Sequence, residues 1–189
     1  SLDLTTHDAQ GREWDFDDDG SRQRARKLVM ETKPMLLVGS PMCTWFSSLI
    51  TRSKARMSPE KFEANFARAV RHLEFAFELY ALQASEGRYF IHEHPHGASS
   101  WHQRCVTAFV ARFPGLHSVV TDMCSFGMRV DRGKVQGPAM KSTRILSNSQ
   151  EVLKRVNRKC PNKGPDASQH HVHVPLEQGR AKRCQIYPR

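Results

Sequence analysis

The stretch from residue 58 to residue 87 constrains the fold most, because its pattern predicts one long amphipathic helix. Ser58 is a good N-cap, Pro59 suits the first helical position, and Gly87 ends the segment. Apolar side chains recur every three or four residues and share one face of such a helix: Phe62, Phe66, Val70, Leu73, Phe77 and Tyr80. We interpret this stripe as a surface that packs on a core, and it implies no cofactor site.

Short apolar runs lie on either side of this helix and alternate with further helical segments. Residues 35–38 form such a run between Pro34 and Gly39, as expected of a strand buried on both faces. The other predicted strands are 88–94, 117–124 and 143–148, and the other predicted helices are 17–34, 99–115 and 147–160. Asp19 or Ser21 is expected to cap the helix at 17–34. This order predicts an α/β sandwich built on a mostly parallel sheet.

The charge is distributed unevenly along the chain. The formal net charge is +10, the pI is about 9.7, and residues 151–189 hold nine basic side chains against three acidic ones. This balance favours a polyanionic partner, most simply nucleic acid, with a solvated basic tail as the alternative. We therefore divide the chain into an α/β domain at residues 1–150 and, at residues 151–189, a basic helix followed by a loop-rich tail that contains Cys and His.

The composition also bears on location. No apolar run approaches the roughly 20 residues of a membrane helix, and the polar N-terminus has no signal-peptide pattern. The five cysteines are an odd number without close spacing, which is not typical of a disulfide framework. We expect a nuclear or cytoplasmic protein in a reducing compartment, without a membrane partner. Because the chain starts at Ser1 without a methionine, we expect a processed product or a piece of a longer protein.

Polar clusters follow the first three predicted strands, at residues 39–48, 92–101 and 124–128. Cys43 lies in the first cluster and Glu93 in the second. Because the carboxyl ends of neighbouring parallel strands meet at one edge of a sheet, we expect these two side chains to lie close together. A cysteine beside a carboxylic acid supports nucleophilic chemistry coupled to proton donation. The alternatives are a Cys43 that only fills space under the turn and a Glu93 that is a surface carboxylate.

Three motifs occur in an order that is known from one enzyme family. They are the Gly-Ser-Pro-Met-Cys turn at 39–43 followed by Phe46 and Ser47, Glu-His-Pro at 93–95, and Phe126–Gly127 followed by Lys141, Thr143, Arg144, Ile145 and Asn148. In these motifs the chain resembles the cytosine-5 DNA methyltransferases, particularly the divergent forms carried in retrotransposon polyproteins. The resemblance covers roughly residues 30 to 150. It implies a Rossmann-like methyltransferase sandwich with DNA as substrate.

The resemblance also implies a chemistry and assigns roles to residues. The target cytosine is flipped into a pocket, and the Cys43 thiolate attacks C6, which makes C5 nucleophilic toward the methyl group of S-adenosylmethionine. Glu93 holds and protonates N3, while Arg144 orients the flipped base or its backbone. The implied substrate-binding residues are Ser40, Pro41, Ser47, Lys141 and Thr143.

The chain departs from the family pattern at three places. Met42 stands where a proline normally precedes the cysteine, and His94 replaces the asparagine that helps to fix the loop. The Phe-x-Gly-x-Gly turn that contacts the methyl donor is missing, which leaves Asp3 as the candidate for binding the ribose of the donor. The alternative function is therefore a catalytically degenerate methyltransferase fold, with or without a zinc staple, that serves as a basic nucleic-acid-binding or structural module of a larger polyprotein or ribonucleoprotein.

The tail offers residues of the types that bind zinc. These are Cys160, His171, His173 and Cys184, and a small loop-rich segment often needs a metal to hold it together. The spacing lacks a Cys-x-x-Cys knuckle. We therefore hold a zinc-stapled tail as an alternative to a tail without metal.

Overall fold

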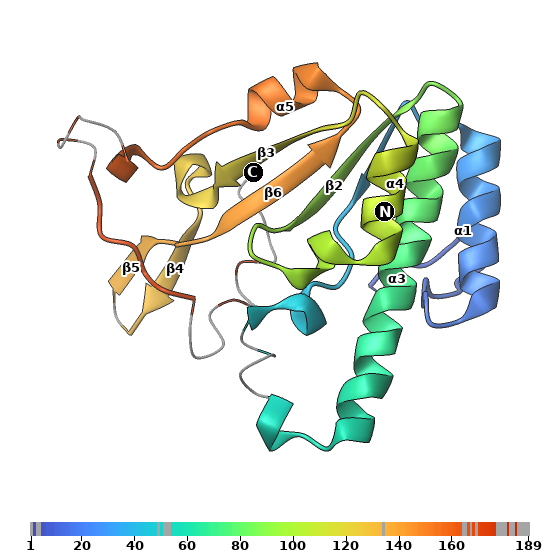
Figure 1. Ribbon diagram of the computed structural model, residues 1–189, viewed down its shortest axis with the longest axis horizontal. Coiled ribbons are helices and arrows are strands. Elements are labelled where there is room, and N and C mark those ends of the chain that lie inside the picture. The colour runs from blue at the N-terminus through green and yellow to red at the C-terminus, as the bar shows by residue number, and fades with distance from the viewer. Residues whose placement is uncertain are drawn as a thin grey trace.

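The computed structural model describes residues 2, 5–48, 50, 54–133, 135–163, 166, 168, 170–176, 181 and 184. Its centre is a four-stranded sheet in the order β1-β2-β6-β3, with a separate two-stranded hairpin (Figure 1). The strands of the sheet are β1 (Leu36–Gly39), β2 (Tyr89–Pro95), β3 (His117–Asp122) and β6 (Ser142–Ser147). The hairpin consists of β4 (Arg129–Arg132) and β5 (Val135–Pro138), which the sequence did not predict. The molecule is thus a mixed α/β protein.

The direction of the strands corrects the sequence-based expectation of a mostly parallel sheet. Only β1 and β2 pair in parallel, while β6 pairs antiparallel with both β2 and β3. The physical reason lies in the connection between β3 and β6. A parallel return requires a crossover, usually a helix, and residues 123–141 supply a short 3₁₀ helix and the hairpin instead.

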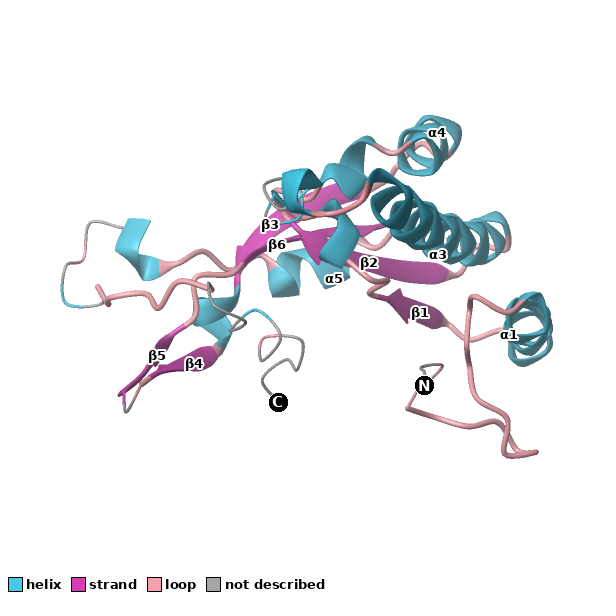
Figure 2. Cartoon of the chain, turned by 90° about the horizontal axis from the view of Figure 1, so that it is seen from below, coloured by secondary structure: helices cyan, strands magenta, loops and turns pink. Residues whose placement is uncertain are grey.

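Helices cover one face of the sheet and part of the other. The helices are α1 (Asp19–Thr32), α3 (Pro59–Ser85), α4 (Arg104–Arg112) and α5 (Gln150–Val156). Both α3 and α4 pack on one face, α1 lies beside α3, and α5 packs against β3 and β6 from the other side (Figure 2). Among the described helices, none combines the length and the apolar character that crossing a membrane would require.

The helix ends follow the local sequence closely. Ser58 caps α3 by accepting a hydrogen bond from the N–H of Lys61 at 3.2 Å, as predicted. The cap of α1 is Asp18, whose carboxylate accepts from the N–H of Ser21 at 2.7 Å, so the expected cap at Asp19 or Ser21 is wrong by one position or more. The helix predicted at 99–115 is a 3₁₀ turn, Ser99–His102, followed by α4.

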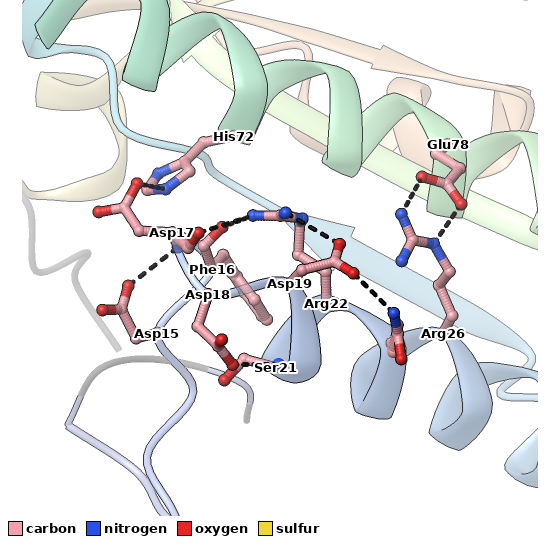
Figure 3. A network of polar contacts seen from close by, with 11 residues as sticks. Asp15, Phe16, Asp17, Asp18, Asp19, Ser21, Arg22, Arg26, His72 and Glu78 are labelled. Carbon is pink, nitrogen blue, oxygen red and sulfur yellow. Dashed lines mark hydrogen bonds and ion pairs between the residues drawn. The ribbon is translucent and has the colours of Figure 1, made fainter. Parts of the chain in front are cut away.

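Polar contacts attach the start of α1 to α3 (Figure 3). Nε2 of His72 lies 2.9 Å from Oδ1 of Asp17, and the guanidinium of Arg26 donates to the carboxylate of Glu78, with Nη2 2.8 Å from Oε2. Beneath these contacts, α1 and α3 share a small apolar core formed by Trp14, Ala25, Val29, Phe75 and Leu79.

The apolar stripe of α3 is core, as the sequence predicts. Leu73, Phe77 and Tyr80 are buried against β2, α4 and the segment after β1, and Phe66 and Val70 pack at the edge of the same cluster. The expectation that the first strand is buried on both faces is wrong. Leu37 faces this core, whereas Leu36 and Val38 on the other face are 37% and 60% exposed, because no described element covers that side of β1.

The described part of the C-terminal segment packs against the ends of β3 and β5. The N–H of Asp122 donates to the carbonyl of Arg158 at 2.9 Å, and the N–H of Val174 donates to the carbonyl of Pro138 at 2.8 Å. A second apolar cluster forms there from Met123, Met128, Val130, Ala139, Val174 and Cys184. Residues far apart in the sequence, near 120–140 and near 158–176, therefore lie side by side.

Candidate active site

Cys43 lies just beyond β1, at the end of the turn formed by residues 39–43, and immediately precedes the short 3₁₀ helix Thr44–Phe46. The turn begins at a position that tolerates only glycine. A Cβ on Gly39 would lie 2.0 Å from the hydroxyl oxygen of Tyr80, inside van der Waals contact. The close approach of α3 to the end of β1 thus fixes where the chain leaves the sheet, and with it the position of Cys43.

His94 holds this turn against β2. Its side chain is fully buried, with Nε2 2.9 Å from the carbonyl oxygen of Pro41 and Nδ1 2.6 Å from Oγ of Ser100. A carbonyl only accepts, so Nε2 carries the proton and Nδ1 accepts from the serine hydroxyl. Burial lowers the pKa of His94, although the bond to Pro41 opposes this effect. The ring is therefore neutral, and one histidine joins the turn after β1 to the turn after β2.

Glu93 lies on the strand next to the turn that carries Cys43, and its charge acts on the Cys43 thiol. Cys43 follows β1, Glu93 belongs to the neighbouring parallel strand β2, and Gly39 of β1 pairs with His92, one residue before Glu93. Oε1 of Glu93 is buried and accepts no hydrogen bond from any described residue. It lies 3.9 Å from Nζ of Lys141, which comes directly before β6. Lys141 was predicted on the resemblance alone, and the structure brings it to this pair.

The electrostatics of the cluster act on the thiol. Burial raises the pKa of Cys43 above its ordinary value, the Glu93 carboxylate raises it further, and the Lys141 ammonium opposes both. The sulfur is consequently a protonated thiol at neutral pH, and the charge of the Glu93 side chain acts on it. This arrangement suits a nucleophile whose proton is delivered to the substrate during attack.

Two residues of β6 predicted for the site lie on opposite faces of the sheet. Thr143 shares the face of Glu93 by register, and its buried Oγ1 has no hydrogen-bond partner among the described residues. Arg144 pairs with His94 and lies on the other face, where its guanidinium sits 5.1 Å from the ring centroid of Trp101. There it lines a hollow of about 330 Å³ between α4 and β3. Arg144 therefore lies on the opposite face of the sheet from Glu93 and Thr143.

The remaining substrate-binding residues predicted from the resemblance lie around the turn. Ser40 is exposed, Pro41 contributes its carbonyl to His94, and Oγ of Ser47 donates to the carbonyl of Thr44 at 3.0 Å. Asp3, the candidate for the ribose of the donor, lies outside the described residues.

The predicted metal ligands come together only in part. Cys160, His171 and His173 converge, but Cys184 is packed in the second apolar cluster, and Cys124 from the end of β3 takes its place beside them. The prediction that Cys184 is a metal ligand is therefore corrected. Its side chain is 2% exposed and is packed among methionine and valine side chains. Cys124 belongs to the polar cluster at 124–128 that follows the third predicted strand, but no sequence spacing connects it to Cys160.

No family model, curated protein or solved structure matches this chain.

The described residues do not fit S-adenosylmethionine. The glycine turn after β1 has its open side filled by the hydroxyl and ring of Tyr80, which leaves no cradle for a ligand at Gly39. The second glycine that follows a strand, Gly97, is exposed beyond His96, and nothing lies within 4 Å of its Cβ position.

Proposed function

We propose that this chain carries the nucleophile and the acid of a cytosine-5 DNA methyltransferase-type site, acting on cytosine in nucleic acid. The observation that supports the proposal is the placement of Cys43 just beyond β1 and of Glu93 on the neighbouring parallel strand β2, with the charges of Glu93 and Lys141 acting on the thiol. The three motifs of the resemblance supply the substrate class. The net charge of +10 supports a nucleic-acid partner, which would be bound largely through its phosphates.

Cys43, Glu93, the base and water together account for every bond and proton of the proposed reaction. As the sulfur of Cys43 bonds to C6 of a flipped cytosine, the thiol proton passes to the Glu93 carboxylate and from there to N3 of the base. The electron pair of the C5–C6 double bond moves into the ring and leaves C5 nucleophilic. C5 then takes a proton from water, loses its original hydrogen, and the thiol is expelled by the reverse path. The net change is exchange of the C5 hydrogen with solvent.

The role of Lys141 follows from its charge. The ammonium lowers the pKa of Cys43 against burial and against the carboxylate, so it stabilises the thiolate character that develops as the proton leaves. It also neutralises the buried Oε1 of Glu93 before substrate arrives. We therefore propose Lys141 as the residue that sets the reactivity of the pair.

A second function is supported by a different observation. Arg144 lies on the opposite face of the sheet from Glu93, and the described glycines at the ends of β1 and β2 form no cradle for a methyl donor, as would suit a methyltransferase-like fold kept as a basic nucleic-acid-binding module. Such a module would bind through phosphates with strong salt dependence, and Cys43 would be dispensable.

One experiment separates these two functions without a methyl donor. DNA tritiated at cytosine C5 is incubated with the full chain, and tritium release is compared between the wild type, Cys43→Ala and Cys105→Ala. Cys105 is the matched control, since it is a half-buried free cysteine on α4. Release that is lost in Cys43→Ala and kept in Cys105→Ala is the expected result. DNA binding without release from the wild type would contradict the catalytic proposal and support the binding module.

A further inference from the structure

Four metal-ligating side chains from distant parts of the sequence converge at the far end of β3. Cys124 lies in the 3₁₀ helix Met123–Phe126, Cys160 follows α5, and His171 and His173 come from the C-terminal segment. The ligand atoms of all four lie within 4.8 Å of one another. Nothing in the Cys43 and Glu93 chemistry uses this cluster.

The separations match the edges of a tetrahedral zinc site. Nε2 of His173 lies 3.4 Å from the sulfur of Cys124 and 3.4 Å from that of Cys160. Nε2 of His171 lies 3.7 Å from the sulfur of Cys160 and 2.9 Å from Nε2 of His173. With Zn–S bonds of about 2.3 Å and Zn–N bonds of about 2.0–2.1 Å, tetrahedral angles give S–N edges of about 3.6 Å and an N–N edge of about 3.3 Å.

Hydrogen bonding alone does not account for this convergence. A neutral imidazole Nε2 has either one N–H or one lone pair, so it makes one good hydrogen bond. Nε2 of His173 nevertheless has three polar neighbours in reach, the sulfurs of Cys124 and Cys160 and Nε2 of His171. A single cation at the centre of the group satisfies all four ligands at once.

The loops that carry the ligands are held together independently of the ligands. The N–H of Cys160 donates to the carboxylate of Asp122 at 2.9 Å, and Oγ of Ser125 donates to the carbonyl of Lys159 at 2.7 Å. Asn162 forms a pair of hydrogen bonds with the backbone of His171, accepting from its N–H at 2.8 Å and donating to its carbonyl at 2.6 Å. The backbone thus presents the two sulfurs and two nitrogens before any ion binds, which lowers the entropic cost of forming a site.

We propose that Cys124, Cys160, His171 and His173 bind one Zn²⁺ in a structural site. Two thiolates and two imidazoles select zinc over harder divalent cations, and four protein ligands leave no open position for catalysis. The ion fastens the segment at 158–174 to the ends of β3 and β5, where the backbone contacts of Arg158 and Val174 already lie. No ligand of this site takes part in the cytosine chemistry, and its test uses no activity.

The test measures metal content on the full chain purified with zinc in the medium and then dialysed. The expected result is one zinc per chain in the wild type, and zinc lost in Cys124→Ala. Cys184→Ala is the matched control, because Cys184 was the ligand expected from the sequence and is packed in apolar surroundings. Cys184→Ala keeps its zinc if the proposed ligand set is right. Cys124→His, which restores a ligand, is expected to recover binding and guards against a variant that merely fails to fold.

Cobalt gives a second readout on the same proteins. Co²⁺ added to the metal-free wild type is expected to produce the visible absorption of a tetrahedral site together with sulfur-to-metal charge transfer, and Cys184→Ala should give the same spectrum. Zinc retained in Cys124→Ala but lost in Cys184→Ala would overturn the ligand set. A folded wild type that binds neither metal, or that contains a Cys124–Cys160 disulfide, would overturn the site.

Discussion

Nε2 of His94 lies 2.9 Å from the carbonyl oxygen of Pro41, so a buried histidine of β2 holds the turn that carries Cys43. The other ring nitrogen accepts from Ser100, and the ring packs near Phe46 and His92. The histidine therefore joins the two turns with both of its nitrogens, and its ring fills the space between them.

Replacing His94 with phenylalanine should destabilise the protein. The substitution keeps an aromatic ring but leaves the Pro41 carbonyl and the Ser100 hydroxyl buried without this partner, at about 1–3 kcal/mol for each group. Urea unfolding followed by circular dichroism measures the loss. His102→Phe, at an exposed position of the next turn, is the control and should change the free energy of unfolding by less than about 0.5 kcal/mol. Equal stability of both variants would show that the bond to Pro41 contributes nothing.

The two buried histidines of β2 should make the protein less stable in mild acid. Burial lowers the pKa of both His92 and His94 below the ordinary value of 6.5. Below pH 6.5 the two histidines are therefore protonated in the unfolded chain but not in the folded chain. The free energy of unfolding consequently falls as the pH drops through that value. Below pH 6.5, each histidine lowers the free energy of unfolding by about 1.4 kcal/mol per pH unit. Urea unfolding at pH 7.5 and 5.5 should show a smaller difference for His92→Phe than for the wild type. If His92→Phe and the wild type lost the same stability between pH 7.5 and 5.5, His92 would not be a source of the acid sensitivity.

Opposite substitutions around Cys43 should move its reactivity in opposite directions. Glu93 raises the pKa of the thiol and Lys141 lowers it. Glu93→Gln should therefore speed alkylation of Cys43 by iodoacetamide at neutral pH, and Lys141→Met should slow it, each severalfold. Mass spectrometry of the labelled peptides measures the rates, with Cys105 in the same sample as the internal reference. If the pair works as proposed, Glu93→Gln should still lose tritium release despite its faster thiol, because the proton path to N3 is broken.

Much of the fold could be predicted because local signals decide it. Ser58, Pro59 and the apolar stripe specify α3, and the order of the first two strands puts Cys43 and Glu93 on neighbouring parallel strands or the turn that follows them. The antiparallel insertion of β6 between β2 and β3 could not be read from β6 itself, since a strand's direction depends on the connection before it. The informative signal was the lack of a helical pattern between residues 124 and 142, which leaves no crossover for a parallel return.

The metal ligands show where sequence reasoning stops. Cys124 and Cys184 are equally plausible partners for Cys160 by residue type, and neither has a diagnostic spacing. Tertiary packing makes the choice: the end of β3 presents Cys124 to the histidines, while Cys184 is enclosed with Met123 and Val174. Tertiary packing also decides which side chains of β6 lie on each face of the sheet. A shift of one residue in register would exchange Thr143 and Arg144 between the two faces.

The proposed zinc should influence Cys43 from a distance through the segment that ends at Lys141. His173 precedes Val174, which bridges to Ala139 and whose carbonyl accepts from the N–H of Met140 at 3.2 Å. Two residues after Ala139, Nζ of Lys141 reaches Glu93. Removing the metal should loosen this segment, weaken the influence of Lys141 on the thiol, and so slow alkylation of Cys43 at neutral pH.

The measurement compares Cys43 alkylation with and without chelator, and metal content is determined in the same samples. Cys105 on α4 should react at the same rate in both, because it lies outside the connected segment. In Lys141→Met, chelation should produce no further slowing of Cys43, since the charge through which this segment acts on the thiol is already gone. Slowing of equal size in the wild type and in Lys141→Met would mean that the metal acts on the turn at Cys43 by another route. An unchanged rate in the wild type after loss of its zinc would show that the two sites are not coupled.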